Sequence, residues 1–152
     1  MCPQYYAIAQ KYAEVIERVH RCYIKRILNV KRTTTINAIY GETVRFPLII
    51  NRKIRVVKYW LKLNNLTANC ILKAVYNMLY NECEIGKTNW VSKIRDVLNV
   101  TGFNFVWLYH QSVVTNVFVP LLKQHLIDTF ITEWRRGIET SPTMLMFKNL
   151  KP

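Results

Sequence analysis

Apolar residues recur at helical spacing along most of this chain of 152 residues. Near the N-terminus, the apolar positions 8, 12, 15, 19 and 22 follow one another at intervals of three or four, as on one face of an α-helix. Alternation typical of a strand is confined to a loose run at 103–109. The pattern predicts an all-α fold, an irregular array of about six helices with a short extended connector near 103–109.

Capping and turn residues set the expected ends of these helices. The Thr33–Thr35 run offers an N-cap to the second helix, and Gly41 is placed to end that helix in the left-handed conformation. Pro47 suits the first turn of the third helix, where its missing N–H is harmless. We expect six helices: from about Gln4 to Leu28, from the threonine run to Tyr40, from Pro47 to about Asn64, from Thr67 to about Glu82, from Asn89 or Thr88 to a point before Gly102, and from about Val114 to Ile138. A short helix is expected to open at Ser141-Pro142.

The same periodicity predicts which side chains are buried. The first helix is expected to turn Ile8, Tyr12, Val15, Val19 and Cys22 inward. The fourth is expected to bury Ile71, Val75, Met78 and Leu79, and the fifth Trp90, Ile94, Val97 and Leu98. The expected stripe of the sixth is Phe118, Leu121, Leu122, His125, Leu126, Phe130 and Trp134. Pro120 lies near the start of that helix, either within its first turns or delaying it.

Positive charge is concentrated in the first half of the chain. Lys and Arg number 22 and Asp and Glu 9, so the net charge is +13. Between Arg18 and Lys62 there are twelve basic residues and only Glu42 as an acid, which gives this stretch +11. Because soluble surfaces normally mix the two signs, we expect a polyanionic partner, RNA or DNA, contacted through phosphates. We expect one helical domain over 1–152, with a basic half at 18–62 and a near-neutral half at 63–152.

The third predicted helix separates apolar from basic residues. Its apolar side chains, Ile50, Val57 and Leu61 among them, fall on one side, and most of its Lys and Arg residues fall on the other. Tyr59 lies among the basic residues, where its ring suits stacking on a base or ribose. Solvated helix faces also carry such charge, and a surface Tyr more often only shields its neighbour, so the structural interpretation stays open. The candidate nucleic-acid-binding residues are Lys25, Arg26, Lys31, Arg32, Arg45, Arg52, Arg55, Lys58, Tyr59 and Lys62.

Catalytic signals are scarce. The chain contains no GxxxxGK[ST], GxGxxG, GxSxG or HExxH motif, and no nucleophile stands beside a base. His125 and Asp128 are three residues apart, but a His on an apolar stripe is more typical of a structural role. We expect no catalytic residue, no small-molecule substrate and no cofactor.

Metal sites and membrane spans are not expected either. The four cysteines contain no CxxC pair, and the three histidines add no cluster to them. Polar residues interrupt the longest uncharged run, Val97 to Leu122. The N-terminus has no apolar segment after a basic one, so we expect no signal peptide and an intracellular location, nuclear or cytoplasmic.

Spaced motifs resemble a known family. The segment from Ile16 to Leu63 contains His20 with Lys25 and Arg26, then a YGE-x-x-R-x-PL turn, then a K-Y-W motif. This order resembles the region downstream of the reverse-transcriptase domain in animal non-LTR (LINE-like) retrotransposon polyproteins. The segments from Thr88 to Tyr109 and from Phe118 to Lys151 are similar to the next part of the same polyproteins. The matching residues of the turn and the last motif are Tyr40, Gly41, Glu42, Arg45, Pro47, Leu48, Lys58, Tyr59 and Trp60.

The resemblance implies a fragment, or a short degenerate reading frame, of a larger polymerase. The nuclease and polymerase of such polyproteins lie upstream, and their catalytic residues have no counterpart here. The implied function is a non-catalytic nucleic-acid-binding module that holds template RNA or target DNA beside the polymerase. One departure concerns Val44, since the family often has Gly just before the Arg of the turn. A valine there is strained if the turn needs a positive φ.

Three alternatives stay open. The chain can be a scaffold that docks on the missing upstream polymerase region, with its basic face against an acidic protein surface. It can also be an inert relic without a selected function. The third alternative is a protein that binds the surface of anionic membranes through a basic helix.

Overall fold

The computed structural model describes residues 3–66, 71–109 and 113–144. Those residues form seven α-helices and a terminal 3₁₀ turn, and no strand occurs among them, which confirms the all-α fold. The helices are α1 (Pro3–Ile27), α2 (Ile36–Thr43), α3 (Leu48–Asn64), α4 (Ile71–Glu84), α5 (Trp90–Val100), α6 (Asn104–Leu108) and α7 (Thr115–Thr140), followed by η2 (Pro142–Met144).

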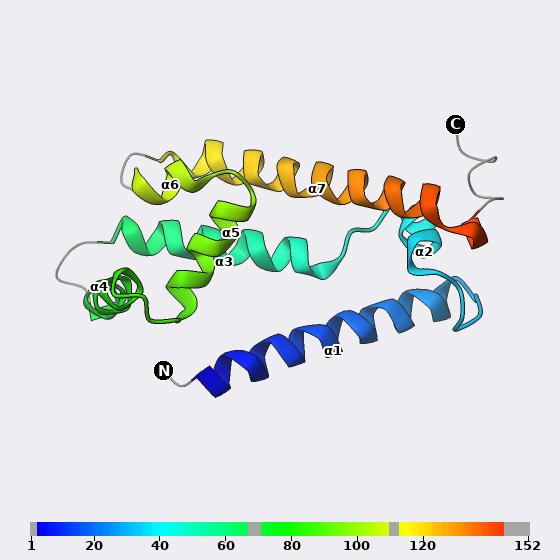
Figure 1. Cartoon of the computed structure of the whole chain (residues 1–152), viewed down its shortest axis with the longest axis horizontal. Helices are drawn as coiled ribbons and strands as arrows, with labels where there is room; N and C mark the ends of the chain where they lie inside the picture. The colour runs from blue at the N-terminus through cyan, green and yellow to red at the C-terminus, as the bar shows by residue number, and fades with distance from the viewer. Residues whose placement is uncertain (1–2, 67–70, 110–112, 145–152) are drawn as a thin grey trace.

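Helix α3 runs through the middle of the array. Figure 1 shows α7 along one side of α3 and α1 on the other, with α1 diverging toward its N-terminus. Helices α4, α5 and α6 gather around one end of α3, and α2 lies at the opposite end, beside the last turns of α7. The neighbouring helices therefore cover part of the surface of α3, and the rest of its surface is open to solvent.

A stack of aromatic rings forms the centre of the core. Trp60 of α3 is fully buried, and its ring lies parallel to that of Trp107, with the centroids 5.6 Å apart. Tyr80 stacks on Trp107 in turn at 5.2 Å. The Trp60 Nε1–H donates to the hydroxyl of Tyr76 over 3.0 Å, so the one polar atom of the indole is satisfied. This stack joins α3, α4 and α6 into one packed unit.

The N-cap of α5 confirms the expectation from the sequence. The Asn89 Oδ1 accepts from the backbone N–H groups of Val91 and Ser92 at 2.9 and 3.0 Å. The Ser92 hydroxyl accepts from the Asn89 N–H, which completes a reciprocal capping box. Asn89 Nδ2 also donates to the Leu79 carbonyl at 2.7 Å, so this cap ties the start of α5 to α4.

The end of α2 differs from the expected one. The helix continues past Gly41 to Thr43, whose hydroxyl donates to the Ile39 carbonyl. Val44 then adopts the left-handed conformation, with φ 51° and ψ 30°. Glycine is therefore not the residue that ends α2; a β-branched residue takes the strained position immediately before Arg45.

The connector expected near 103–109 is helical, so the prediction of an extended segment is wrong. Val106 and Trp107 are both buried. In a strand, adjacent side chains point to opposite faces, so the two could not pack against the same core. In a helix their side chains are about 100° apart and reach the same core. Gly102, with φ 75°, ends α5 and turns the chain toward this short helix.

Two helices present a different face to the core from the one predicted. On α4 the buried residues are Tyr76 and Cys83, whereas Ile71, Val75 and Met78 are exposed and only Leu79 of the predicted set is partly buried. Tyr76 turns inward because its hydroxyl meets Trp60 and its ring meets those of Tyr80 and Trp90. On the part of α1 whose side chains are described, from Tyr12 on, the buried residues are Glu17 and Ile24, whereas Tyr12, Val15, Val19 and Cys22 are exposed. The side chain of Ile8 lies outside the described residues.

Helix α7 follows its predicted stripe more closely. Phe118, Leu122 and Leu126 are buried at intervals of four, and Phe130 and Trp134 are partly buried. Leu121 and His125 are exposed, since they lie on the flank of that stripe. Pro120 lies inside the helix, in its second turn. Thr67, the expected cap of the fourth helix, lies outside the described residues.

Candidate nucleic-acid interface

Helix α3 presents its cations on the side away from the core. Ile50, Val57 and Leu61 are buried, in agreement with the predicted apolar side. The opposite side carries four exposed basic residues and Tyr59. We call this set the α3 basic face; it comprises Arg52, Arg55, Lys58, Tyr59 and Lys62.

Part of the α3 basic face lines a groove beside the start of α7. The groove has a volume of about 590 Å³ and is lined by Arg55, Lys58, Tyr59, Lys62, Asn65, Leu66 and Thr115. Of these lining residues three are basic and none is acidic. Thr115 is the first residue of α7, where the helix dipole contributes partial positive charge. We call this feature the α3–α7 groove. All the charged residues that line it are cations.

Tyr59 forms one wall of the groove while its side chain remains 51% exposed. Its other neighbour is Trp90 at the start of α5, with the ring centroids 6.2 Å apart and the planes inclined by 43°. The indole of Trp90 in turn lies 6.4 Å from the ring of Tyr76, which belongs to the buried core. The tyrosine ring is therefore supported from behind and open in front.

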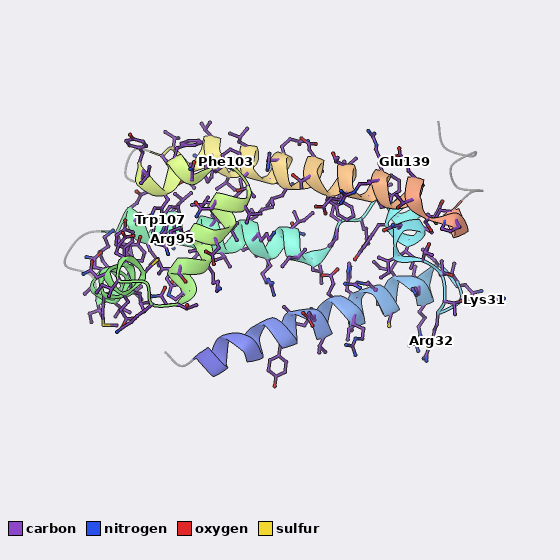
Figure 2. All side chains as sticks on the ribbon, viewed as in Figure 1. Lys31, Arg32, Arg95, Phe103, Trp107 and Glu139 are labelled. Carbon is purple, nitrogen blue, oxygen red and sulfur yellow. The ribbon has the colours of Figure 1, made fainter. Side chains whose placement is uncertain are left out.

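The other predicted residues lie apart from the groove. Arg26, Lys31 and Arg32 are exposed around the connection between α1 and α2, and Figure 2 shows Lys31 and Arg32 at the end of the molecule away from Arg95 and Trp107. Lys25 is half-buried, and its ammonium donates to the Arg32 carbonyl, so it serves that connection. Arg45 is exposed between α2 and α3. The ten predicted residues thus form no single patch.

A second groove separates α1 from α3, and its charge is mixed. Its volume is about 920 Å³, and the charged residues that line it are Glu14, Glu17, Arg21, Arg52, Arg55 and Glu133. Three carboxylates beside three guanidinium groups make a poor surface for a polyanion. Arg52 and Arg55 both line this groove together with its acidic residues, whereas Lys58 and Lys62 do not. Arg55 lies between the two grooves and lines both.

Glu17 positions the start of α3, a role that the sequence did not reveal. Its Oε1 accepts from the Tyr40 hydroxyl at 2.8 Å, and its Oε2 accepts from the Leu48 N–H, the first of α3, at 3.1 Å. The Arg21 Nε lies 4.0 Å from the same carboxylate. A negative charge at this end of α3 is favourable because the N–H groups of a first turn lack partners within the helix. Glu17 and Arg21 are one helical turn apart in the sequence, a spacing that gives no sign of the contact with α3.

Burial raises the pKa of Tyr40 to about 12, and the bond to Glu17 adds to the effect. The phenol is therefore neutral at physiological pH, and its O–H donates a hydrogen bond to the Glu17 carboxylate. Because Tyr40 belongs to α2 and Glu17 to α1, this bond joins both helices to the N-terminus of α3.

Other reactive groups are dispersed. Cys22 is exposed, and Cys83 is buried, where desolvation raises the pKa of its thiol and so disfavours a nucleophilic thiolate. Within the described ranges, no three His, Cys, Asp or Glu side chains come together as a set that could hold a metal ion. Over those same residues, no helix has the length and apolar character needed to cross a membrane.

Comparisons with known proteins add no relative. The chain matches no protein-family model, no curated protein and no solved structure.

Proposed function

We propose that this chain is a non-catalytic module that binds nucleic acid through the α3–α7 groove. The observation that carries the proposal is the lining of that groove, with three cations and no carboxylate on one concave surface. A solvated helix face of no function would be expected to mix acidic residues among its basic ones.

The spacing of the cations suits a phosphate backbone. Arg55, Lys58 and Lys62 follow at intervals of three and four residues on one rigid helix. The rise from Arg55 to Lys62 is about 10.5 Å, at about 1.5 Å per residue. A duplex strand presents one phosphate per roughly 3.4 Å of its axis, so the row covers about three phosphates. Contacts of this kind position a strand without reading its sequence.

Salt titration tests the proposal directly. If three cations each neutralise one phosphate, log K is expected to fall against log[salt] with a slope of about −2.7 on duplex DNA and about −2.1 on a single strand. The measurement is fluorescence anisotropy of labelled RNA and DNA oligonucleotides at salt concentrations from about 50 to about 300 mM. Binding without salt dependence, or no binding at low salt, contradicts the proposal.

A charge-matched pair of variants locates the site. Replacing Arg55, Lys58 and Lys62 with Glu removes the cations of the groove and is expected to weaken binding to all sequences alike. The control replaces Arg26, Lys31 and Arg32 with Glu, which changes the net charge equally but at the α1–α2 connection. All six residues are exposed, so both variants are expected to retain their helical circular dichroism. Equal loss in the two variants would indicate attraction to net charge rather than to the groove.

The origin that we propose for the module is a retrotransposon reverse-transcriptase polyprotein. The positive φ of Val44 supports this origin, because it falls at the position where the resembled family often has Gly. In that setting the groove holds template RNA or target DNA beside the polymerase, inside the cell, in the nucleus or the cytoplasm. Synthesis and strand cleavage would belong to the upstream parts of such a polyprotein.

Docking on an upstream polymerase region is a second candidate function, favoured by the surface of α1. Five apolar side chains at intervals of three or four are between 58% and 64% exposed: Tyr12, Ile16, Val19, Tyr23 and Ile27. Exposed apolar stripes of this length are typical of interaction surfaces. Replacing Ile16 and Val19 with Ser is expected to abolish co-purification with the upstream polymerase region, while the affinity for nucleic acid stays unchanged. Retained co-purification would contradict docking through α1.

A further inference from the structure

The aromatic wall of the α3–α7 groove distinguishes it from a surface that contacts phosphates alone. Tyr59 is about one helical turn from both Arg55 and Lys62, so it shares their side of the helix, and Lys58 lines the same groove. Half of that side chain is open, and the other side is supported by Trp90. A supported ring loses little conformational freedom when a second flat group stacks on it.

The partner of such a ring is an unstacked base. In a duplex the base faces are covered by neighbouring base pairs, so only edges and phosphates are offered to a protein. In a single strand the faces are free, and stacking on a tyrosine accepts any of the bases. The ring of Tyr59 therefore gains a contact from a single strand that a duplex does not provide.

The shape of the groove agrees with that partner. The groove has a volume of about 590 Å³ and is open to solvent, so an extended strand can lie across it. Leu66 and Thr115 add apolar atoms to the lining, and Asn65 adds an amide. A concave surface with an aromatic wall, apolar atoms and a cationic rim suits a base together with its phosphates. A duplex backbone needs only the cations.

We infer that the α3–α7 groove binds single-stranded nucleic acid, with a base stacked on Tyr59 and the flanking phosphates on Arg55, Lys58 and Lys62. This inference rests on the proposed function and names its substrate class. Preference for a base type is expected to be weak, because every base presents a π-face. The strand can be RNA or DNA, since the chemistry that the groove recognises is common to both.

Three probes of equal length and label test the inference: a single strand, a duplex, and a single strand with abasic sites. Tyr59→Ala and Tyr59→Leu are each expected to weaken binding of the single strand about 5- to 140-fold, the range that corresponds to one stacked base. Binding of the duplex and of the abasic strand is expected to change less than about twofold, because neither offers a free base. Tyr59→Phe keeps the ring and is expected to bind like the wild type.

The variants separate stacking from folding. Leucine preserves apolar contact with Trp90 but has no flat ring, and duplex affinity in the same preparation reports whether the groove has kept its shape. Tyr12→Ala, at a tyrosine 64% exposed on α1, controls for loss of any surface aromatic. Unchanged single-strand affinity in both Tyr59→Ala and Tyr59→Leu overturns the inference, and so does an equal loss on all three probes in both. Failure of the proposed function is a different result, because the wild type then binds none of the probes in a salt-dependent way.

Discussion

Replacing Val44 with glycine is expected to stabilise the protein by about 1 kcal/mol. The left-handed conformation costs an L-residue about 1–2 kcal/mol, and a β-branched residue falls at the upper end of that range. Glycine adopts it without this cost. At φ 51° and ψ 30°, Val44 lies inside the left-handed region, at its lower edge, so the cost of that conformation applies to it.

Two opposing effects reduce the gain. Glycine gives the unfolded chain more conformational freedom, which lowers stability by about 0.5–1 kcal/mol. The Val44 side chain is 80% exposed, so its removal loses only a small part of the roughly 1.5–3 kcal/mol that full burial of a valine provides. With about 2 kcal/mol of strain relieved, about 1 kcal/mol remains, which corresponds to a rise in Tm of about 2–4 °C for a protein of this size.

Urea unfolding followed by circular dichroism measures the change, provided that the slope m is the same in both proteins. Val100→Gly is the matched control, because Val100 is 83% exposed and ends α5 without a positive φ. There glycine only adds unfolded-state entropy, and a loss of about 0.5–1 kcal/mol is expected. If Val44→Gly destabilises the protein as much as Val100→Gly does, the assignment of strain to Val44 is refuted.

The remaining predictions concern the α5 cap and the two buried tyrosines. Asn89→Ala is expected to lower the free energy of unfolding by about 2–3 kcal/mol, because it removes the two cap bonds and the bond from Asn89 Nδ2 to the Leu79 carbonyl. Asn89→Asp keeps the cap acceptor and is expected to lose less; equal losses by urea unfolding would contradict the role of the cap. Burial raises the pKa of both Tyr40 and Tyr76 to about 12, above their ordinary value of 10.0, so their contribution to stability is complete below pH 10 and is lost as the pH rises toward 12. Unfolding free energies between pH 8 and 11 are expected to fall at the alkaline end, and Tyr40→Phe is expected to flatten that fall; a profile that rises above pH 10 would contradict it.

Most helix positions were predictable because the signals for them are local. The Asn89 cap and the turn at Gly102 depend on residues within a turn of the helix end. The start of α3 was predicted to within one residue, since Pro47 is the N-cap of α3 and not part of its first turn. The segment at 103–109 is different, because its β-formers and loose alternation favour a strand while its distant partners favour a helix. Phe103 meets Phe118 at 5.4 Å, a contact across fifteen residues that no local pattern contains.

The buried faces were less predictable than the helices themselves. On α4 the aliphatic residues outnumber the aromatic ones, yet the inward face is the one that carries Tyr76 and Tyr80, since the rings of Trp60, Trp90 and Trp107 lie there. On α1 the inward face carries Glu17, because the first N–H of α3 and the Tyr40 hydroxyl both need an acceptor at that place. Which face of a helix is buried depends on the side chains and hydrogen-bonding groups of the helix packed against it, and that helix is distant in sequence.

The sequence by itself determined the helical class, the concentration of positive charge between Arg18 and Lys62, and the separation of apolar from basic residues on α3. Each of these follows from composition or from the periodicity of a single helix. Only the tertiary structure decided which cations share a surface. Arg55, Lys58 and Lys62 line one groove with Thr115 of α7, and Arg52 and Arg55 line the groove of mixed charge beside α1. Lys25 is bonded to the α1–α2 connection. The physical reason is that a groove is formed by two elements, and the packing of α3 against α7 and α1 sets the surroundings of each charge.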